Sequence, residues 1–149
     1  MSATFHQALL QLVNARLQAL PSVPASSVYV ERVAAIDREE CPAINLLPGD
    51  TRFESIGADG DWDLLRATCA FTLKVHTRGD PHTQLADPVI ADAHTAVMAD
   101  PTLGGFAMRL RVVSSRPQQA PADGTAGIYE LGYEVTLAVS EQNLALQQV

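Results

Sequence analysis

The histidines and aspartates between positions 76 and 94 form the one cluster in this sequence that could bind a metal. Its members are His76, His82, His94, Asp80, Asp87 and Asp92. Zinc sites use ligands at short, regular spacings, and the run 87–94 contains no such spacing. A helix through this run places His94 on its apolar side, where a histidine held by a partner in the core or at its boundary is expected. We therefore predict no metal site.

Residues for acid–base or nucleophilic catalysis are not arranged for that chemistry either. Asp61 and Asp63 are close in sequence, but acid–base catalysis needs positioned groups with shifted pKa values, and these two aspartates lie in an expected exposed loop. Cys41 and Cys69 form no CxxC pair, and we predict that Cys69 is a buried, inert thiol. A nucleophile elbow and a phosphate-binding glycine loop are both missing from the sequence. We expect no catalytic residue and no cofactor.

Composition restricts the class of protein. The chain has 149 residues, of which 47% are hydrophobic and 18% charged, which is typical of one globular domain over residues 1–149. No apolar run approaches the roughly 20 residues of a membrane span, and we expect no secretory signal. The formal net charge of −7 disfavours nonspecific binding to nucleic acid, which requires a basic surface.

Hydrophobic periodicity predicts two helices and five strands. The helices are expected at 3–20 and from about 83 or 87 to 99, and the strands at 27–34, 41–49, 65–78, 106–113 and 128–139. In the strand 65–78, apolar and polar residues alternate strictly, so one face should be buried and the other polar. Because strands arrive in runs with few crossovers, we predict an α+β fold in the order α-β-β-β-α-β-β. Two helices should cover one face of a mostly antiparallel sheet.

The remaining segments are predicted as loops. Residues 50–63 are rich in acidic side chains and glycine, and we expect an exposed loop or hairpin tip there. Residues 114–127 contain prolines and small polar residues, which predicts a long mobile loop. The tail 140–149 is short and rich in glutamine, and we expect it to be frayed.

Four pieces of the sequence, spread over residues 3–139, together resemble a known family. They are the amphipathic N-terminal helix followed by Val28-Tyr29-Val30, the strand Cys41-Pro42-Ala43-Ile44-Asn45-Leu46, the strand end Val75-His76-Thr77-Arg78, and the run 91–105 that ends Asp100-Pro101-Thr102-Leu103-Gly104-Gly105. In this order they resemble the tail terminator proteins of long-tailed bacteriophages and prophages, also called tail completion or minor tail proteins. The run that ends Asp-Pro-Thr-Leu-Gly-Gly is the most specific of the four.

The resemblance implies an α+β structural protein of the virion. It implies a hexameric ring, assembled in the cytoplasm of the bacterial host, that sits on the head-proximal end of the tail tube. There the ring ends tube polymerisation and offers a surface for joining the head. Its partners are then other copies of the chain, the tail tube protein and a head–tail connector or neck protein. DNA passes through such a ring without specific binding, and the family brings no catalytic residue, metal, cofactor or membrane contact.

A ring needs a heterologous contact between subunits, and charged residues are candidates for it. The basic candidates are Arg109, Arg111 and Arg116, and the loop candidates are Asp50, Arg52, Glu54, Asp59 and Asp61. The stretch 79–105, with four aspartates and no basic residue, adds to the acidic side. Our hypothesis is that the acidic and basic patches meet across subunits or face the tube. The alternative is that both are ordinary solvated surfaces.

Two other functions stay open from the sequence. Another phage neck or head–tail connector protein would share the size, symmetry and acidity of a terminator. A small-molecule-binding α+β module would instead show a concave apolar pocket with converging polar groups.

Overall fold

The computed structural model describes residues 4–55, 64–79, 81–119 and 126–147, which fold into one mixed sheet with two α-helices. The helices are α1 (Phe5–Leu17) and α2 (His82–Met98), and two 3-10 turns are η1 (Ala25–Ser27) and η2 (Arg38–Glu40). The strands are β1 (Val28–Val30), β2 (Ala43–Ser55), β3 (Leu64–Arg78), β4 (Ala107–Gln119), β5 (Ala126–Ser140) and β6 (Leu146–Gln147). The predicted α+β class and the order of its elements are confirmed.

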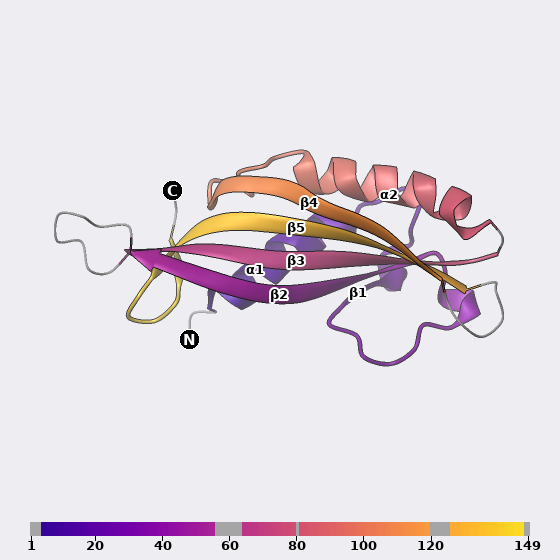
Figure 1. The fold of residues 1–149 in the computed structure, drawn as a ribbon, viewed down its shortest axis with the longest axis horizontal. Coiled ribbons are helices and arrows are strands. Elements are labelled where there is room, and N and C mark those ends of the chain that lie inside the picture. The colour runs from indigo at the N-terminus through magenta and orange to yellow at the C-terminus, as the bar shows by residue number, and fades with distance from the viewer. Residues whose placement is uncertain (1–3, 56–63, 80, 120–125, 148–149) are drawn as a thin grey trace.

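The sheet has the strand order β1-β2-β3-β5-β4 (Figure 1). The short strand β1 runs parallel to β2, and all the other neighbouring strands are antiparallel, as expected for this fold class. The long strands β3 and β5 pair over their whole length, from Leu64 opposite Ser140 to Arg78 opposite Ala126. They form the centre of the sheet, and β4 and β2 flank them.

Both helices cover the same face of the sheet. The helix α1 packs against β1 and β2, and α2 packs against β3, β5 and β4, while the two helices also touch each other. Figure 1 shows α1 behind the strands, with no helix in front of them. The core between helices and sheet includes Phe5, Phe71 and Tyr133, all with no exposed area. Among the described residues, no helix covers the other face of the sheet.

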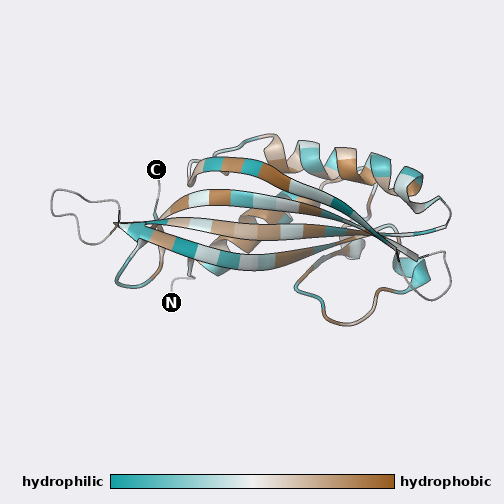
Figure 2. Ribbon diagram, in the orientation of Figure 1, coloured by the Kyte–Doolittle hydropathy of each residue, from teal (hydrophilic) through white to brown (hydrophobic). Residues whose placement is uncertain are grey.

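The strand β3 shows how alternation produces a two-faced sheet. Every second residue from Ala67 to Val75 is buried against the helices, and the intervening residues face away from them. The same alternation continues in β5, where Leu131, Tyr133 and Val135 are buried. Figure 2 shows the alternation as changing bands of hydropathy along the long strands. The predicted burial of one face is therefore confirmed for both central strands.

The predicted acidic loop at 50–63 is wrong in its first part. The strand β2 continues to Ser55, so Asp50, Arg52 and Glu54 belong to the sheet. The turn-forming run Pro48-Gly49-Asp50 is absorbed as an irregularity in the pairing with β3, between Pro48 and Thr51. Gly49 permits this because a Cβ there would lie 2.9 Å from the Cβ of Ala70. Residues 56–63, which include Asp59 and Asp61, lie outside the described residues.

The predicted long loop at 114–127 is also wrong over most of its length. The strand β4 continues to Gln119 and β5 begins at Ala126, so the two strands form a long hairpin. Pro117 is compatible with this because β4 is an edge strand, where a missing backbone N–H costs little. Residues 120–125 lie outside the described residues.

The alternation expected at 106–113 is interrupted. The apolar spacing of Phe106, Met108, Leu110 and Val112 predicts burial of Met108, but Met108 is exposed and its neighbour Ala107 is buried. The pairing of β4 with β5 shifts between Ala107 and Arg109 and again between Val112 and Ser114. Each shift inserts an extra residue and moves the following side chains to the opposite face.

Three smaller differences concern the ends of elements. The strand predicted at 27–34 stops at Val30, because Glu31 adopts a positive φ of 54°. The helix α2 begins at His82, so Pro88 lies inside it and not in its first turn. The tail at 140–149, predicted to fray, contains the short strand β6, which pairs with Ala138 and Val139 of β5. Residues 148–149 lie outside the described residues.

The turn after α2 gives a physical role to the most specific piece of the sequence resemblance. The Asp100 carboxylate accepts hydrogen bonds from the backbone N–H groups of Thr102, at 3.0 Å, and Gly104, at 2.9 Å. These bonds, with that of the Thr102 hydroxyl, lower the pKa of Asp100 to about 2. Leu103 is fully buried at a φ of 50°, and Gly104 and Gly105 follow at positive φ. The motif therefore directs the chain from α2 into β4.

Neither α1 nor α2 is long and apolar enough to cross a membrane, and they are the only α-helices among the described residues.

Candidate interaction surface

The sheet face opposite the helices carries most of the charged strand residues, and we call it the outer face. Its charged side chains come from four strands: Arg52 and Glu54 of β2, Arg66 and Lys74 of β3, Glu130 and Glu134 of β5, and Arg109, Arg111 and Arg116 of β4. Six of these are basic and three acidic, whereas the whole chain has a formal net charge of −7. The outer face is thus the basic side of an acidic protein.

Ion pairs connect the strands across the outer face. Glu134 lies between two arginines, 3.0 Å from Arg111 Nη2 and 3.8 Å from Arg52 Nη2. Glu130 lies in the same way between Arg116, at 2.9 Å, and Lys74, at 3.5 Å.

A separate ion pair joins β2 and β3, in which Arg66 Nη1 is 3.6 Å from Glu54 Oε2. Arg109 is exposed and forms no ion pair within the described residues. Exposed ion pairs contribute only about 0–1 kcal/mol each to the free energy of unfolding, so these pairs matter more for the charge of the outer face than for stability.

The outer face holds five of the predicted candidates, and all but Arg109 belong to its ion pairs: Arg52, Glu54, Arg109, Arg111 and Arg116. Asp50 lies in the irregularity of β2, and Asp59 and Asp61 lie outside the described residues. Arg52 from the expected acidic loop and Arg111 from the expected basic patch share the carboxylate of Glu134. Glu130 and Glu134 were not selected as candidates from the sequence. Their spacing of four on the polar side of an alternating strand, beside an arginine-rich strand, is the signal that could have identified them.

A second polar cluster, also not selected from the sequence, anchors the segment after β1. Arg32 Nη2 donates to Glu40 Oε1 at 2.9 Å and to the carbonyl of Ala35 at 2.7 Å, and its guanidinium stacks 4.4 Å above the Tyr29 ring. Tyr29 also donates to Glu40. Hydrogen bonds from Arg32, Tyr29 and the Asp37 backbone lower the pKa of Glu40 to about 2.

The Asn45 side chain completes this anchor from β2. Its Oδ1 accepts from the backbone N–H of Arg32 at 3.1 Å, and its Nδ2 donates to the Arg32 carbonyl at 2.8 Å. Both bonds hold the segment after β1 against β2. We therefore interpret this cluster as structural.

The histidines and cysteines behave largely as structural groups. His94 Nδ1 lies 2.8 Å from the Tyr133 hydroxyl, so His94 is a half-buried histidine with a partner at the boundary of the core, as predicted. Cys69 is buried, as predicted, and burial raises the pKa of its thiol. His76 is half-buried on β3 and lines a small cavity together with Ile36 and Ile128. No group of three metal-ligating side chains comes together in the part of the chain that the structure describes.

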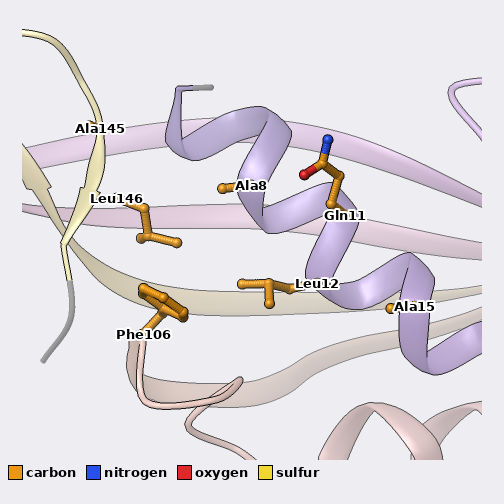
Figure 3. A pocket seen from close by; sticks show the side chains of 7 residues that line it. All are labelled: Ala8, Gln11, Leu12, Ala15, Phe106, Ala145 and Leu146. Carbon is orange, nitrogen blue, oxygen red and sulfur yellow. The ribbon is translucent and has the colours of Figure 1, made fainter. Parts of the chain in front are cut away.

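An open groove of about 470 Å³ lies on the helix side, against α1 (Figure 3). It is bounded by α1, by Phe106 just before β4, and by Leu146 of β6. Alanines and leucines line it, and Gln11 contributes the one polar side chain among its lining residues. The groove therefore lacks the converging polar groups that specify a small molecule.

The sequence matches no protein-family model, and no curated protein matches it significantly. Among solved structures, a chain from the structure described as the virion of a native gene transfer agent particle superposes with a TM-score of 0.50. The two chains are 13% identical, and the alignment covers 87% of this chain and 94% of the other. A second solved chain is 21% identical over 89% of this chain and 90% of its own length, and its TM-score is 0.38. The first similarity shows a shared fold over most of the chain.

Proposed function

We propose that this protein is a structural component of a phage-like virion, a tail terminator that forms a ring on the head-proximal end of the tail tube. In this role the ring, a hexamer, ends tube polymerisation and presents the surface to which the head-side connector binds. Its partners are other copies of the chain, the tail tube protein and the connector or neck protein. The protein acts without catalytic chemistry, metal or cofactor.

The observation that carries this proposal is the fold shared with a virion chain over 87% of this protein. Two features of the structure support it. The sheet leaves a whole charged face without a helical layer, and the network on that face joins four strands into one broad surface. Surfaces of this kind suit contacts between proteins better than binding of a small ligand.

The experiment is to measure the mass of the purified protein by size-exclusion chromatography with light scattering and to image it by negative-stain electron microscopy. We expect closed rings of about six subunits, because a heterologous contact that closes gives a cyclic assembly. If the free protein is monomeric, the same imaging is repeated after adding tail tubes purified from the phage or prophage of origin. Rings at one end of the tubes support the proposal. Bare tube ends contradict it.

The alternative in the same class is another neck or head–tail connector protein. It would also form rings, but these would bind isolated heads or connectors and leave tube ends free. A tube-elongation assay separates the two functions. A terminator added during polymerisation of the tube protein should shorten the tubes in proportion to its concentration, and a connector should leave their length unchanged.

A further inference from the structure

The sheet has two strand edges without a neighbour among the described residues. One is the β4 edge, the side of β4 (Ala107–Gln119) that faces away from β5. The other is the β2 edge, residues 47–55 of β2, because β1 pairs only with Ile44, Asn45 and Leu46. Unpaired edges of this length offer rows of free backbone N–H and C=O groups, which other chains can use to extend the sheet.

Exposed apolar side chains gather at these two edges. Seven large hydrophobic residues are exposed in the described structure, and four of them are at the edges: Phe53 on β2, and Met108, Val112 and Val113 on β4. The residues Val113 and Phe53 are 51% and 45% exposed. A folded monomer gains nothing by exposing these side chains, whereas burial between two copies would stabilise an assembly.

Two of these four apolar residues, Val112 and Phe53, also lie on the same side of the sheet. Val112 is paired with Tyr133 and Phe53 with Ala67, and both of these partners are buried against the helices. If the β4 edge of one copy lay beside the β2 edge of the next, Val112 and Phe53 would both lie on the helix side of the joined sheet.

The charges of the two edges are complementary. The strand β4 carries Arg109, Arg111 and Arg116 and no acidic residue. The β2 edge carries Asp50 and Glu54 with one arginine, Arg52. Pairing of β4 with β4 of a second copy would instead bring arginines together, and like charges on paired strands are destabilising.

The strand directions permit this pairing. Each of the pairs β2–β3, β3–β5 and β5–β4 is antiparallel, so β4 runs opposite to β2. A second copy that continues the sheet in the same orientation therefore brings its β2 edge antiparallel to the β4 edge of the first. This contact is heterologous, and it can close into a ring after a fixed rotation.

We infer that the β4 edge of one copy pairs with the β2 edge of the next copy, so that one sheet passes through all the subunits of the ring. This inference rests on the proposed function and names the contact that closes the ring. The partner is a second copy of this chain. The Arg109 side chain, which has no ion pair within the described monomer, belongs to the contact.

The test exchanges the charges of the two edges. One variant reverses the β4 edge (Arg109→Glu with Arg111→Glu), and the other reverses the β2 edge (Asp50→Arg with Glu54→Arg). Arg38→Glu and Glu39→Arg, on the exposed turn η2, are the matched controls. Thermal melting of each monomer verifies that it is folded. Assembly is measured by light scattering and microscopy, with tail tubes added if the wild type requires them.

We expect each reversed variant alone to need about tenfold more protein than the wild type to form rings, which corresponds to about 1.4 kcal/mol per contact. The controls should assemble as the wild type does. An equimolar mixture of the two reversed variants should form rings again, because each reversed edge then meets its complement. A β4–β4 contact would predict no effect of reversing the β2 edge and no rescue on mixing.

The outcomes that contradict the edge pairing differ from the outcome that contradicts the proposed function. If the wild type forms rings and both reversed variants form them at the same concentration, the edge pairing is wrong and the ring function stands. If the mixture fails to restore rings, the pairing is also wrong. If the wild type forms no ring, alone or on tubes, the proposed function fails, and the edge pairing fails with it.

Discussion

At the scale of single residues, a hydrogen bond joins Tyr133 in the core to the half-buried His94 of α2. Tyr133 has no exposed area, its ring stacks on Phe71 with the centroids 5.0 Å apart, and its hydroxyl is 2.8 Å from His94 Nδ1. Tyr133→Phe keeps the stacking and leaves the His94 nitrogen without this partner. We expect the free energy of unfolding in urea to fall by about 1–2 kcal/mol.

The control for this substitution is Tyr129→Phe. The Tyr129 hydroxyl lies 2.6 Å from Ser115 Oγ, at an exposed site where water can replace the lost partner. A loss below about 0.5 kcal/mol is expected there. Equal losses of unfolding free energy in the two variants would contradict a special role for the Tyr133–His94 hydrogen bond.

A second prediction at this scale concerns His76 and the pH dependence of stability. Burial, helped by the charges of Lys74 and Arg78, lowers the pKa of His76 to about 4 from the usual 6.5. Between these values the unfolded chain takes up a proton that the folded chain does not. The free energy of unfolding should therefore decrease as the pH falls from about 6.5 to about 4.

The measurement compares urea unfolding of the wild type and His76→Gln at about pH 7.5 and about pH 4.5. Other groups titrate in both proteins, so the contribution of His76 is the difference between their losses of stability. The wild type should lose more on acidification. A variant that loses as much as the wild type would show that His76 does not titrate in this way.

At the scale of elements, the close approach of β2 to β3 at Gly49 is what allows β2 to continue past its turn-forming residues. A Cβ at position 49 would lie 2.9 Å from the Ala70 Cβ and 3.1 Å from the Ala70 carbonyl oxygen. Gly49→Ala should therefore lower the free energy of unfolding by about 1–3 kcal/mol, as overpacking does.

Ala70→Gly in the same chain provides the control for Gly49→Ala. Alone it should cost about 0.5–1 kcal/mol, because glycine weakens a strand. In the double variant it removes the Cβ that position 49 would meet, so the combined loss should be smaller than the sum of the two single losses. Strictly additive losses would show that contact with the Ala70 Cβ is not what destabilises Gly49→Ala.

At the scale of the whole molecule, the ion pairs of the outer face determine whether its arginines are available to DNA. Glu130 and Glu134 contact four basic side chains, and the chain has a formal net charge of −7. Fluorescence anisotropy with a labelled duplex at about 0.15 M salt should give a dissociation constant weaker than about 10⁻⁴ M, the weak end of nonspecific binding.

The variant Glu130→Gln with Glu134→Gln removes both shared carboxylates and keeps the shape of the side chains. It should bind the same duplex measurably better than the wild type, and added salt should weaken that binding. Micromolar binding by the wild type would contradict the assignment of the outer face to protein contacts.

The sequence predicted the central sheet and both helices because their signals are local. Alternation in 65–78 and 128–139 predicts two-faced strands wherever the neighbours are, and the spacing of Phe5, Leu9, Val13 and Leu17 predicts an apolar helix face. It mistook parts of β2 and β4 for loops because Gly, Pro and Ser normally indicate turns. There the pairing with β3 and β5 supplies hydrogen bonds that outweigh local propensity.

The fold class, the order of most elements and the apolar faces of the central strands can be predicted from the sequence, since each depends on periodicity within one segment. Which charges meet depends on the tertiary structure. Arg52 and Arg111 are far apart in sequence and share Glu134, because register aligns β2, β3, β5 and β4. The same holds for the two free edges, because an edge exists only once the order of strands is known. Pairing between distant segments depends on the whole sheet, and no local pattern encodes it.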